Sequence, residues 1–318
     1  MSALPPPLPT PAISVRDLHR TFGNVQAVRG ISFDVFPGQV VGFIGANGAG
    51  KTTTMRILTT LDSPTSGTAE ICGCDVLNYP TEVRQRIGWM PDTYGAYEYM
   101  TVAEYLDFYG RAFGLKGTAR WHRVREVMDF ADLTPLAQRP ANKLSKGQSQ
   151  RLCLGRTLLH DPEVLILDEP AAGLDPKARI EFKNLIRLLA VQGKTIFISS
   201  HILSELAEMC DTMLFIDQGQ VVHFGSAENL RQHDSEEVFI DVRLAGDSAA
   251  LAQWAETHPG VQLAGTHRQG GRLRMASTEP EAVAACLRQM VADGLPVLDF
   301  HREERRLEDA FVDILKRK

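Results

Sequence analysis

The stretch GANGAGKTTT (residues 45–54) directly follows the apolar run VVGFI (residues 40–44) and constrains the fold more than any other part of the chain. It fits the pattern G-x-x-x-x-G-K-[ST] at Gly45, Gly48, Gly50, Lys51 and Thr52. Glycines let the backbone turn sharply and approach an anion, and N–H groups at the start of a helix point toward phosphate oxygens. The alternative is an ordinary glycine-rich turn. The full pattern after an apolar run favours a phosphate-binding loop that joins a buried strand to a helix.

The polar side chains of this loop have separate predicted roles. Lys51 is expected to neutralise the β- and γ-phosphates of a nucleotide, and the Thr52 hydroxyl is expected to be an oxygen ligand for Mg²⁺. Thr53 can add a hydrogen bond to an α-phosphate, and Asn47 lies in the same loop. The loop therefore predicts a nucleoside triphosphate and Mg²⁺ as ligands.

Two other apolar runs support a parallel sheet. VLILD (164–168) and TIFIS (195–199) are apolar at consecutive positions, which is typical of parallel strands buried on both faces. From residue 13 such strands alternate with amphipathic helices, so the expected fold class is α/β, a P-loop nucleoside triphosphatase. With 318 residues, of which 44% are hydrophobic, the chain is long enough for about two domains.

The first domain is expected to span residues 13–234, after a flexible, proline-rich tail at residues 1–12. Within it, roughly residues 83–160 read as mostly helical, and TVAE at 101–104 has the pattern of a capping box. We interpret this stretch as a helical subdomain inserted into the sheet domain. The short polar sequence QHDSE (232–236) is predicted to be a linker.

The second domain, residues 235–318, is predicted to be an α+β domain with the ferredoxin-like order βαββαβ. Its expected strands are VFIDVRL (238–244), two strands that meet at Gly270–Gly271, and PVLDF (296–300). One helix is expected from Asp247 to Trp254, and a second has the apolar positions Val283, Leu287, Met290 and Val291. A last helix is predicted at the C-terminus, with an apolar face formed by Leu307, Phe311, Ile314 and Leu315.

Charge and cysteine content argue against several classes of protein. The 34 Lys and Arg against 39 Asp and Glu give a formal net charge of -5, so no general attraction to nucleic acid or anionic membranes is expected. Five cysteines fit reduced thiols better than a disulfide framework. The sequence has no recognisable signal peptide and no apolar run of membrane-spanning length. Taken alone, the chain is expected to be soluble and cytoplasmic.

Two carboxylates, Asp168 and Glu169, follow the buried strand in VLILDEP. Charge at the end of a buried strand is unfavourable unless a cation lies close, and a magnesium nucleotide would supply that cation. LSKGQ (144–148) lies just upstream, AGLDP (172–176) just downstream, and His201 follows the run TIFISS. Together with the phosphate loop, these are five motifs in a fixed order.

The order and spacing of the five motifs resemble the ATPase subunit of an ABC transporter. The resemblance covers roughly residues 13–230. The C-terminal domain, with LEDAFVDIL at 307–315, resembles an appendage found on many ABC-2 type export ATPases, such as drug-resistance and lipid or polysaccharide exporters.

The resemblance implies roles for the polar residues that follow the buried strands. Asp168 is similar to the aspartate that holds Mg²⁺ through its water shell. Glu169 is similar to the general base that polarises the attacking water. His201 matches the histidine that hydrogen-bonds the γ-phosphate and positions this water; the alternative is a histidine with only a structural role.

LSKGQ resembles the signature motif of the family, in which Ser145, Gly147 and Gln148 would bind the γ-phosphate of ATP held by the opposite subunit. Two copies must then meet head to tail around two ATP molecules. Lys146 departs from the pattern, because the family most often has glycine there. On its own, LSKGQ would more often be a solvated helix cap.

Three further positions complete the expected site. Asp175 resembles a residue that communicates across the dimer, and with Pro176 it also fits the cap of a helix. Phe22 falls where the family places an aromatic ring against adenine; the alternative is a core phenylalanine. Asp92 stands where the family commonly has a glutamine that touches Mg²⁺ and contacts the membrane subunit.

The resemblance implies the nucleotide-binding subunit of an exporter, an ATPase that drives a separate ABC-2 type permease. The chain would then lie on the inner face of the cell membrane through that permease, as a homodimer or with a close homologue. The alternatives are an ABC-type ATPase that acts on nucleic acid or ribosomes and a purely regulatory nucleotide-binding module. Glu169 favours turnover over regulation, and no nucleic-acid partner is expected.

Overall fold

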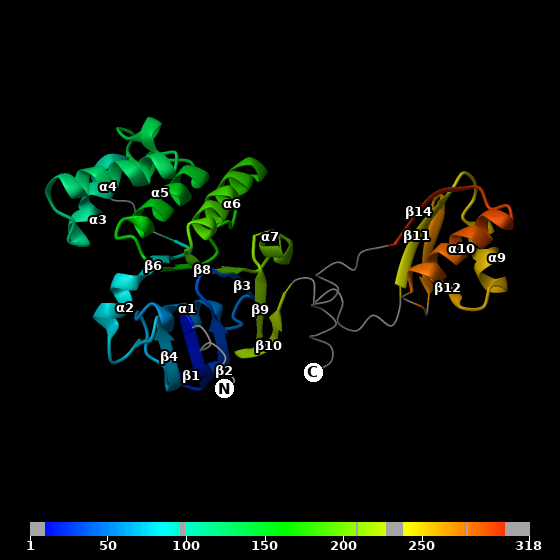
Figure 1. The fold of residues 1–318 in the computed structure, drawn as a ribbon, viewed down its shortest axis with the longest axis horizontal. Helices are drawn as coiled ribbons and strands as arrows, with labels where there is room; N and C mark the ends of the chain where they lie inside the picture. The colour runs from blue at the N-terminus through cyan, green and yellow to red at the C-terminus, as the bar shows by residue number, and fades with distance from the viewer. Residues whose placement is uncertain are drawn as a thin grey trace, which may run out of the picture. The chain divides into compact units, whose positions relative to one another are not determined.

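The computed structural model describes residues 10–93, 95, 99–207, 209–226, 238–275, 277 and 279–302. The chain divides into two compact units, 1–227 and 228–318 (Figure 1). The boundary predicted at 234/235 and the linker predicted at 232–236 lie outside the described residues and stay predictions. Ala12, expected in the flexible tail, is buried, and its N–H donates to the Val35 carbonyl at 2.8 Å, so the fold begins before residue 13. The C-terminal helix predicted at 307–315 lies outside the described residues.

The centre of the first unit is a six-stranded sheet with the order β10-β9-β3-β8-β7-β6. All pairs among β9, β3, β8, β7 and β6 are parallel, and β10 is antiparallel to β9. The three apolar runs predicted as parallel strands form the neighbours β3, β8 and β7, and every residue of these strands is buried. The strands are β3 (Val40–Ile44), β6 (Ile87–Met90), β7 (Val164–Leu167), β8 (Thr195–Ser200), β9 (Thr212–Asp217) and β10 (Gln220–Gly225).

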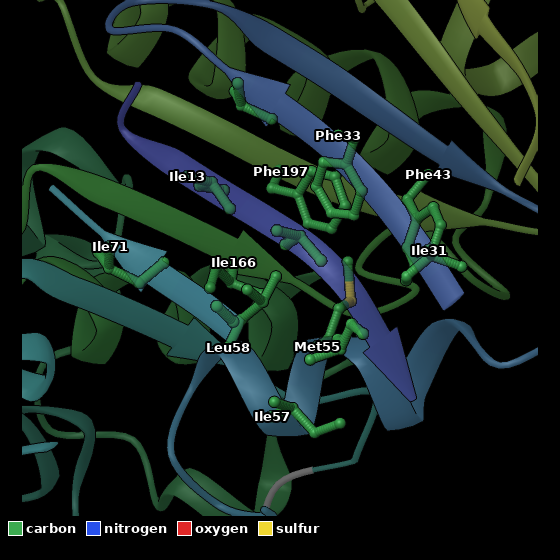
Figure 2. Close-up of a cluster of buried hydrophobic side chains, with 14 of the residues drawn as sticks. Ile13, Ile31, Phe33, Phe43, Met55, Ile57, Leu58, Ile71, Ile166 and Phe197 are labelled. Carbon is green, nitrogen blue, oxygen red and sulfur yellow. The ribbon is translucent and has the colours of Figure 1, made fainter. Parts of the chain in front are cut away.

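A second sheet, which the sequence did not predict, covers one side of this core. It is antiparallel with the order β2-β1-β4-β5, and its strands are β1 (Ile13–Phe22), β2 (Val25–Val35), β4 (Ser66–Ile71) and β5 (Cys74–Asp75). Helix α1 (Lys51–Leu58) belongs to the same buried cluster as both sheets. In Figure 2 the rings of Phe33 and Phe197 stack across this cluster with centroids 5.6 Å apart. The helix that follows the glycine-rich loop is therefore held firmly in the core.

The helical segment contains α2 (Pro80–Arg86), α3 (Val102–Ala112), α4 (Gly117–Phe130) and α5 (Lys146–Leu158). The stretch of roughly 83–160, predicted as mostly helical, also contains β6, which pairs with β7 in the central sheet. The capping box at 101–104 is confirmed: Thr101 and Glu104 exchange hydrogen bonds at the start of α3. Further helices are α6 (Pro176–Val191) and α7 (Leu203–Ala207), and no helix among the described residues could cross a membrane.

The second unit contains its elements in the predicted order. They are β11 (Val238–Leu244), α9 (Ala249–Thr257), β12 (Val261–His267), β13 (Gly270–Met275), α10 (Pro280–Ala292) and β14 (Val297–Arg302). The antiparallel sheet has the order β12-β13-β11-β14, with its own core. Gly270 begins β13 and does not form the turn as expected; a Cβ there would lie 1.9 Å from the Val242 carbonyl oxygen. Val291, predicted on the apolar face of α10, is 60% exposed.

Candidate functional site

The glycine-rich loop connects β3 to α1, as the sequence predicts. Gly50 caps the helix with a φ of 107°, and a Cβ there would lie only 2.5 Å from the carbonyl oxygen of Ala27 on β2. Asn47 and Gly48 at the crest of the loop are exposed, whereas Gly45 at its start is buried. The crest of the loop is therefore accessible to an anion, while its base is fixed by both sheets.

Lys51 is buried at the first position of α1, with only 6% of its side chain exposed. Its ammonium donates hydrogen bonds to the carbonyl oxygens of Gly45 at 2.7 Å and Ala46 at 3.2 Å. The ammonium thus lies over the loop itself. Thr52 is exposed and Thr53 is half-buried on the following positions of the helix.

Asp168 follows the last residue of β7 and is buried. Its Oδ1 accepts a hydrogen bond of 2.6 Å from the Ser199 hydroxyl, and Thr52 also donates to this carboxylate. Burial raises the pKa of Asp168 above its usual value, the hydrogen bonds from Ser199 and Thr52 lower it, and the charges of Glu169 and Asp92 raise it further. The carboxylate is therefore held in place by hydrogen bonds, but these only partly balance its negative charge.

The side chain of Glu169 lies between those of His201 and Lys51. Its Oε2 lies 2.8 Å from Nδ1 of His201, and its Oε1 lies 3.7 Å from the Lys51 ammonium. Its backbone has a φ of 48°, a conformation that is rare for residues other than glycine, and its N–H donates to Ser199 at 2.9 Å. The ends of β7 and β8 and the phosphate loop thus bring three predicted residues together.

Ser199 is a site residue that sequence reasoning missed. It lies in the middle of TIFISSH, next to Ser200, and its hydroxyl contacts both predicted carboxylate residues. Only the pairing of β7 with β8, in which Leu167 lies opposite Ile198, could have indicated this residue. This register places the residue after Ile198 beside the residue after Leu167.

The residues around Asp168 suit a hard cation such as Mg²⁺. The charges of Glu169 and Asp92 act on the carboxylate of Asp168, and the hydroxyl of Thr52 adds an oxygen donor. Among the described residues, no group of three or more His, Cys, Asp and Glu side chains could hold a metal ion alone. Mg²⁺ is usually bound through one or two carboxylates together with substrate phosphates and water, so this donor set fits.

The signature segment forms the start of α5. Ser145 caps this helix: its hydroxyl accepts a hydrogen bond from the Gln148 N–H at 3.3 Å, and the Gln148 side chain accepts one from the Ser145 N–H at 3.0 Å. Gly147 is the second helical residue. The Ser145 hydroxyl acts as an acceptor in this pair, so its own proton is not used there.

Asp175 caps α6, as the sequence predicts, accepting a hydrogen bond from the Ala178 N–H at 2.8 Å with Pro176 at the first helical position. Lys146 is exposed, and its ammonium lies against the backbone of Gly173 just before this cap. Within the described residues, no hydrogen bond or ion pair joins Ser145, Gln148 or Asp175 to the phosphate loop. These residues form a second group on the same unit.

Phe22 and Asp92 lie at the margins of the site. Phe22 ends β1 and is 45% exposed, so the alternative of a core phenylalanine is wrong. Asp92 is exposed two residues after the end of β6, and its charge reaches Asp168. Both side chains are therefore accessible to a ligand.

Comparisons with known proteins agree with this geometry. Residues 28–172 match the family model described as ABC transporter. The chain is 34% identical to Nod factor export ATP-binding protein I of Ralstonia nicotianae, over 97% of this chain and 95% of that protein. It is 35% identical to the ABC transporter ATP-binding protein NatA of Bacillus subtilis, over 74% of this chain and all of the relative. A solved ATP-binding subunit of an ABC transporter, 28% identical, superposes with a TM-score of 0.63 over 70% of this chain and 92% of its own.

Proposed function

Since this chain belongs to the ATP-binding subunits of ABC transporters and is an ATPase, we propose that it powers export through a separate membrane permease of the ABC-2 type. Two copies, or one copy and a close homologue, close head to tail over two ATP molecules. The names of the relatives support the export direction, and the βαββαβ order of the second unit supports a ferredoxin-like appendage. The permease holds the chain at the inner face of the cell membrane.

The observation that carries the proposal is the position of Glu169 between His201 and Lys51, next to the buried Asp168. Glu169 accepts the proton of the attacking water, and His201 holds the Glu169 carboxylate and the water in line with the γ-phosphate. Lys51 binds the β- and γ-phosphates. Asp168 and Thr52, together with Asp92, would hold Mg²⁺, which would offset the charge of the phosphates.

The remaining contacts to ATP come from the loop and from β1. Backbone N–H groups of Gly45, Asn47, Gly48 and Gly50 surround the phosphates, and the Thr53 hydroxyl donates to the α-phosphate. Phe22, at the exposed end of β1, stacks on adenine. The base is thus bound by the end of β1 and the phosphates by the loop between β3 and α1.

The second copy completes each site. Ser145 donates its hydroxyl proton to the γ-phosphate bound by the partner, assisted by Gly147, Gln148 and the start of α5. Asp175, which caps α6 in the same unit, lies at the contact between the copies. A single chain therefore binds ATP but hydrolyses it slowly.

Mixing two inactive variants tests this division of roles. Ser145→Ala and Lys51→Ala should each lose most ATPase activity, because every site in either homodimer lacks one half. A mixture forms some dimers in which one site combines an intact Lys51 with an intact Ser145 of the partner. Activity should therefore reappear on mixing, in a phosphate-release assay. If no activity returns although mixed dimers are seen by mass, the shared site is refuted or both sites are needed together.

A pocket of about 740 Å³ between α3 and α4 is the proposed docking site for the permease. Its lining combines exposed aromatic rings with charged side chains, among them Tyr99, Phe108, Trp121, Asp107 and Asp129. Tyr99 is 93% exposed and lies on the segment that leads from Asp92 to α3. A helix of the permease seated in this pocket would therefore be connected to the catalytic residues through a short stretch of chain.

Trp121→Ala is expected to weaken permease binding about tenfold or more, because buried aromatic anchors dominate such interfaces. The ATPase activity of the isolated subunit should stay unchanged. Binding is measured by titrating the subunit onto its permease in detergent. Tyr79→Ala is the matched control, since Tyr79 is 55% exposed and lies outside the pocket. Equal effects of both substitutions would count against the pocket.

A further inference from the structure

We propose that Arg20 is a positioning residue that fixes the ring of Phe22 as the platform for the adenine base and so contributes to the affinity for the base but not for the phosphates. This inference rests on the proposed role of Phe22 in ATP binding. It assigns a function to an ion pair that lies outside all five sequence motifs.

The geometry around Phe22 is asymmetric. The Arg20 guanidinium lies over the ring, 4.2 Å from its centroid. The same guanidinium is anchored by Asp62, with 2.7 Å between Nη2 and Oδ1, and the two side chains are only 22% and 16% exposed. Phe22 as a residue remains 45% exposed. One face of its ring is therefore covered by an anchored cation, while part of the residue stays open to a ligand.

The ion pair also connects the ring to α1, the helix that follows the phosphate loop. Asp62 lies four residues beyond the end of α1, the helix that begins at Lys51, and its N–H donates to the Arg56 carbonyl at 3.1 Å. On the other side, Phe22 pairs with Val25 across a turn to β2. Ala27, which contacts the Gly50 position, is two residues farther along β2, about 7 Å at the rise of a strand. Phe22 is thus linked through Arg20 and Asp62 to the C-terminal end of α1, and through β2 to the segment that contacts Gly50.

The chemistry of this arrangement favours a purine. A guanidinium over one face of a phenyl ring is attracted by its electrons, a contact that is stronger when the cation is shielded from water. The cation draws electron density toward itself, so the opposite face becomes a better partner for an electron-rich base. It also restricts the rotamers of a side chain at the end of a strand, which reduces the entropy lost when the base binds.

The test compares two probes on the full chain. Arg20→Gln removes the cation and keeps a polar side chain; it should raise the dissociation constant for Mg-ATP about three- to tenfold, as expected for losing one cation–π contact. The inhibition constant of magnesium tripolyphosphate, which has no base, should stay within twofold. Arg16→Gln is the matched control, because Arg16 lies on the same strand and pairs with Asp34 at 2.7 Å.

Two other variants keep the test decisive. Asp62→Asn removes the anchor of Arg20 but keeps Arg20 itself, so it should raise the dissociation constant for Mg-ATP by a smaller factor. This variant replaces Arg20→Gln in the test if Arg20→Gln folds poorly. Arg20→Gln added to Phe22→Ala should weaken ATP binding little beyond Phe22→Ala alone, since the two residues act together.

Three results would overturn the inference. Equal weakening of ATP and tripolyphosphate would mean that Arg20 only supports α1 and the phosphate loop. Unchanged ATP affinity in Arg20→Gln, together with a loss in Phe22→Ala, would mean that the ring needs no support. If Phe22→Ala itself leaves ATP affinity unchanged while Lys51→Ala lowers it, the adenine platform is misplaced and the inference falls with it, although the phosphate site stands.

Discussion

Glu169→Gln is expected to lower ATP turnover by about 10²- to 10⁴-fold, the usual contribution of a general base, while ATP still binds. Glutamine has the same shape but cannot accept a proton from water. The carboxylate lies 2.8 Å from His201 and 3.7 Å from Lys51 in a side chain that is only 14% exposed, so no bulk solvent base can replace it easily. Phosphate release and ATP titration measure the two quantities separately.

Glu163→Gln is the matched control for this prediction. Glu163 lies directly before the first residue of β7, at the opposite end of this strand from Glu169. It is 63% exposed, and its carboxylate lies 4.0 Å from the Arg86 guanidinium. Its substitution should leave turnover within twofold, because exposed ion pairs contribute little. Undiminished turnover in Glu169→Gln would remove the assignment of the base.

Lys51→Ala has the second large expected effect, a loss of ATP affinity of about tenfold to a hundredfold, equivalent to one or two charge-assisted hydrogen bonds. The ammonium is buried in the phosphate loop and is held there by the carbonyl groups of Gly45 and Ala46. Without it, the phosphates lose their main positive partner in this subunit. Isothermal titration with ATP in the presence of Mg²⁺ measures the change.

Lys177→Ala provides the comparison, because Lys177 is 88% exposed and forms a surface ion pair with Glu181 of the same helix, with 4.0 Å between Nζ and Oε1. Thermal unfolding of both variants distinguishes lost binding from lost structure. If Lys51→Ala binds ATP as tightly as the unchanged chain, the loop is not the phosphate site.

The central sheet and the catalytic edge could be predicted because they depend on local patterns. Continuous apolar runs in VVGFI, VLIL and TIFIS are typical of strands that are buried on both faces, and β3, β7 and β8 confirm them. Polar residues that follow such strands must lie at one edge of a parallel sheet. The proximity of Lys51, Glu169 and His201 follows from that rule, and their contacts agree with it. Their roles toward ATP stay predictions.

The features that sequence reasoning missed depend on pairing between distant segments. Strand β1 has an irregular burial pattern with bulges at several positions, so its period is neither that of a strand nor that of a helix. Ser199 gains its role only from the register of β8 against β7. Arg20 precedes the phosphate loop in the sequence and Asp62 follows it, and the two side chains form an ion pair. Neither residue belongs to a sequence motif that would predict this contact.

The central claim is that two copies of this chain close over ATP, and the mass of Glu169→Gln in solution tests it most directly. Light scattering should show a monomer without nucleotide and with Mg-ADP, and a doubling of mass with saturating Mg-ATP, because the slowed site holds ATP and the closed state persists. Adding Ser145→Ala to this variant should prevent the doubling, since the partner's ATP then loses the Ser145 hydroxyl. A Glu169→Gln chain that binds ATP fully and yet remains a monomer at high protein concentration would contradict the account.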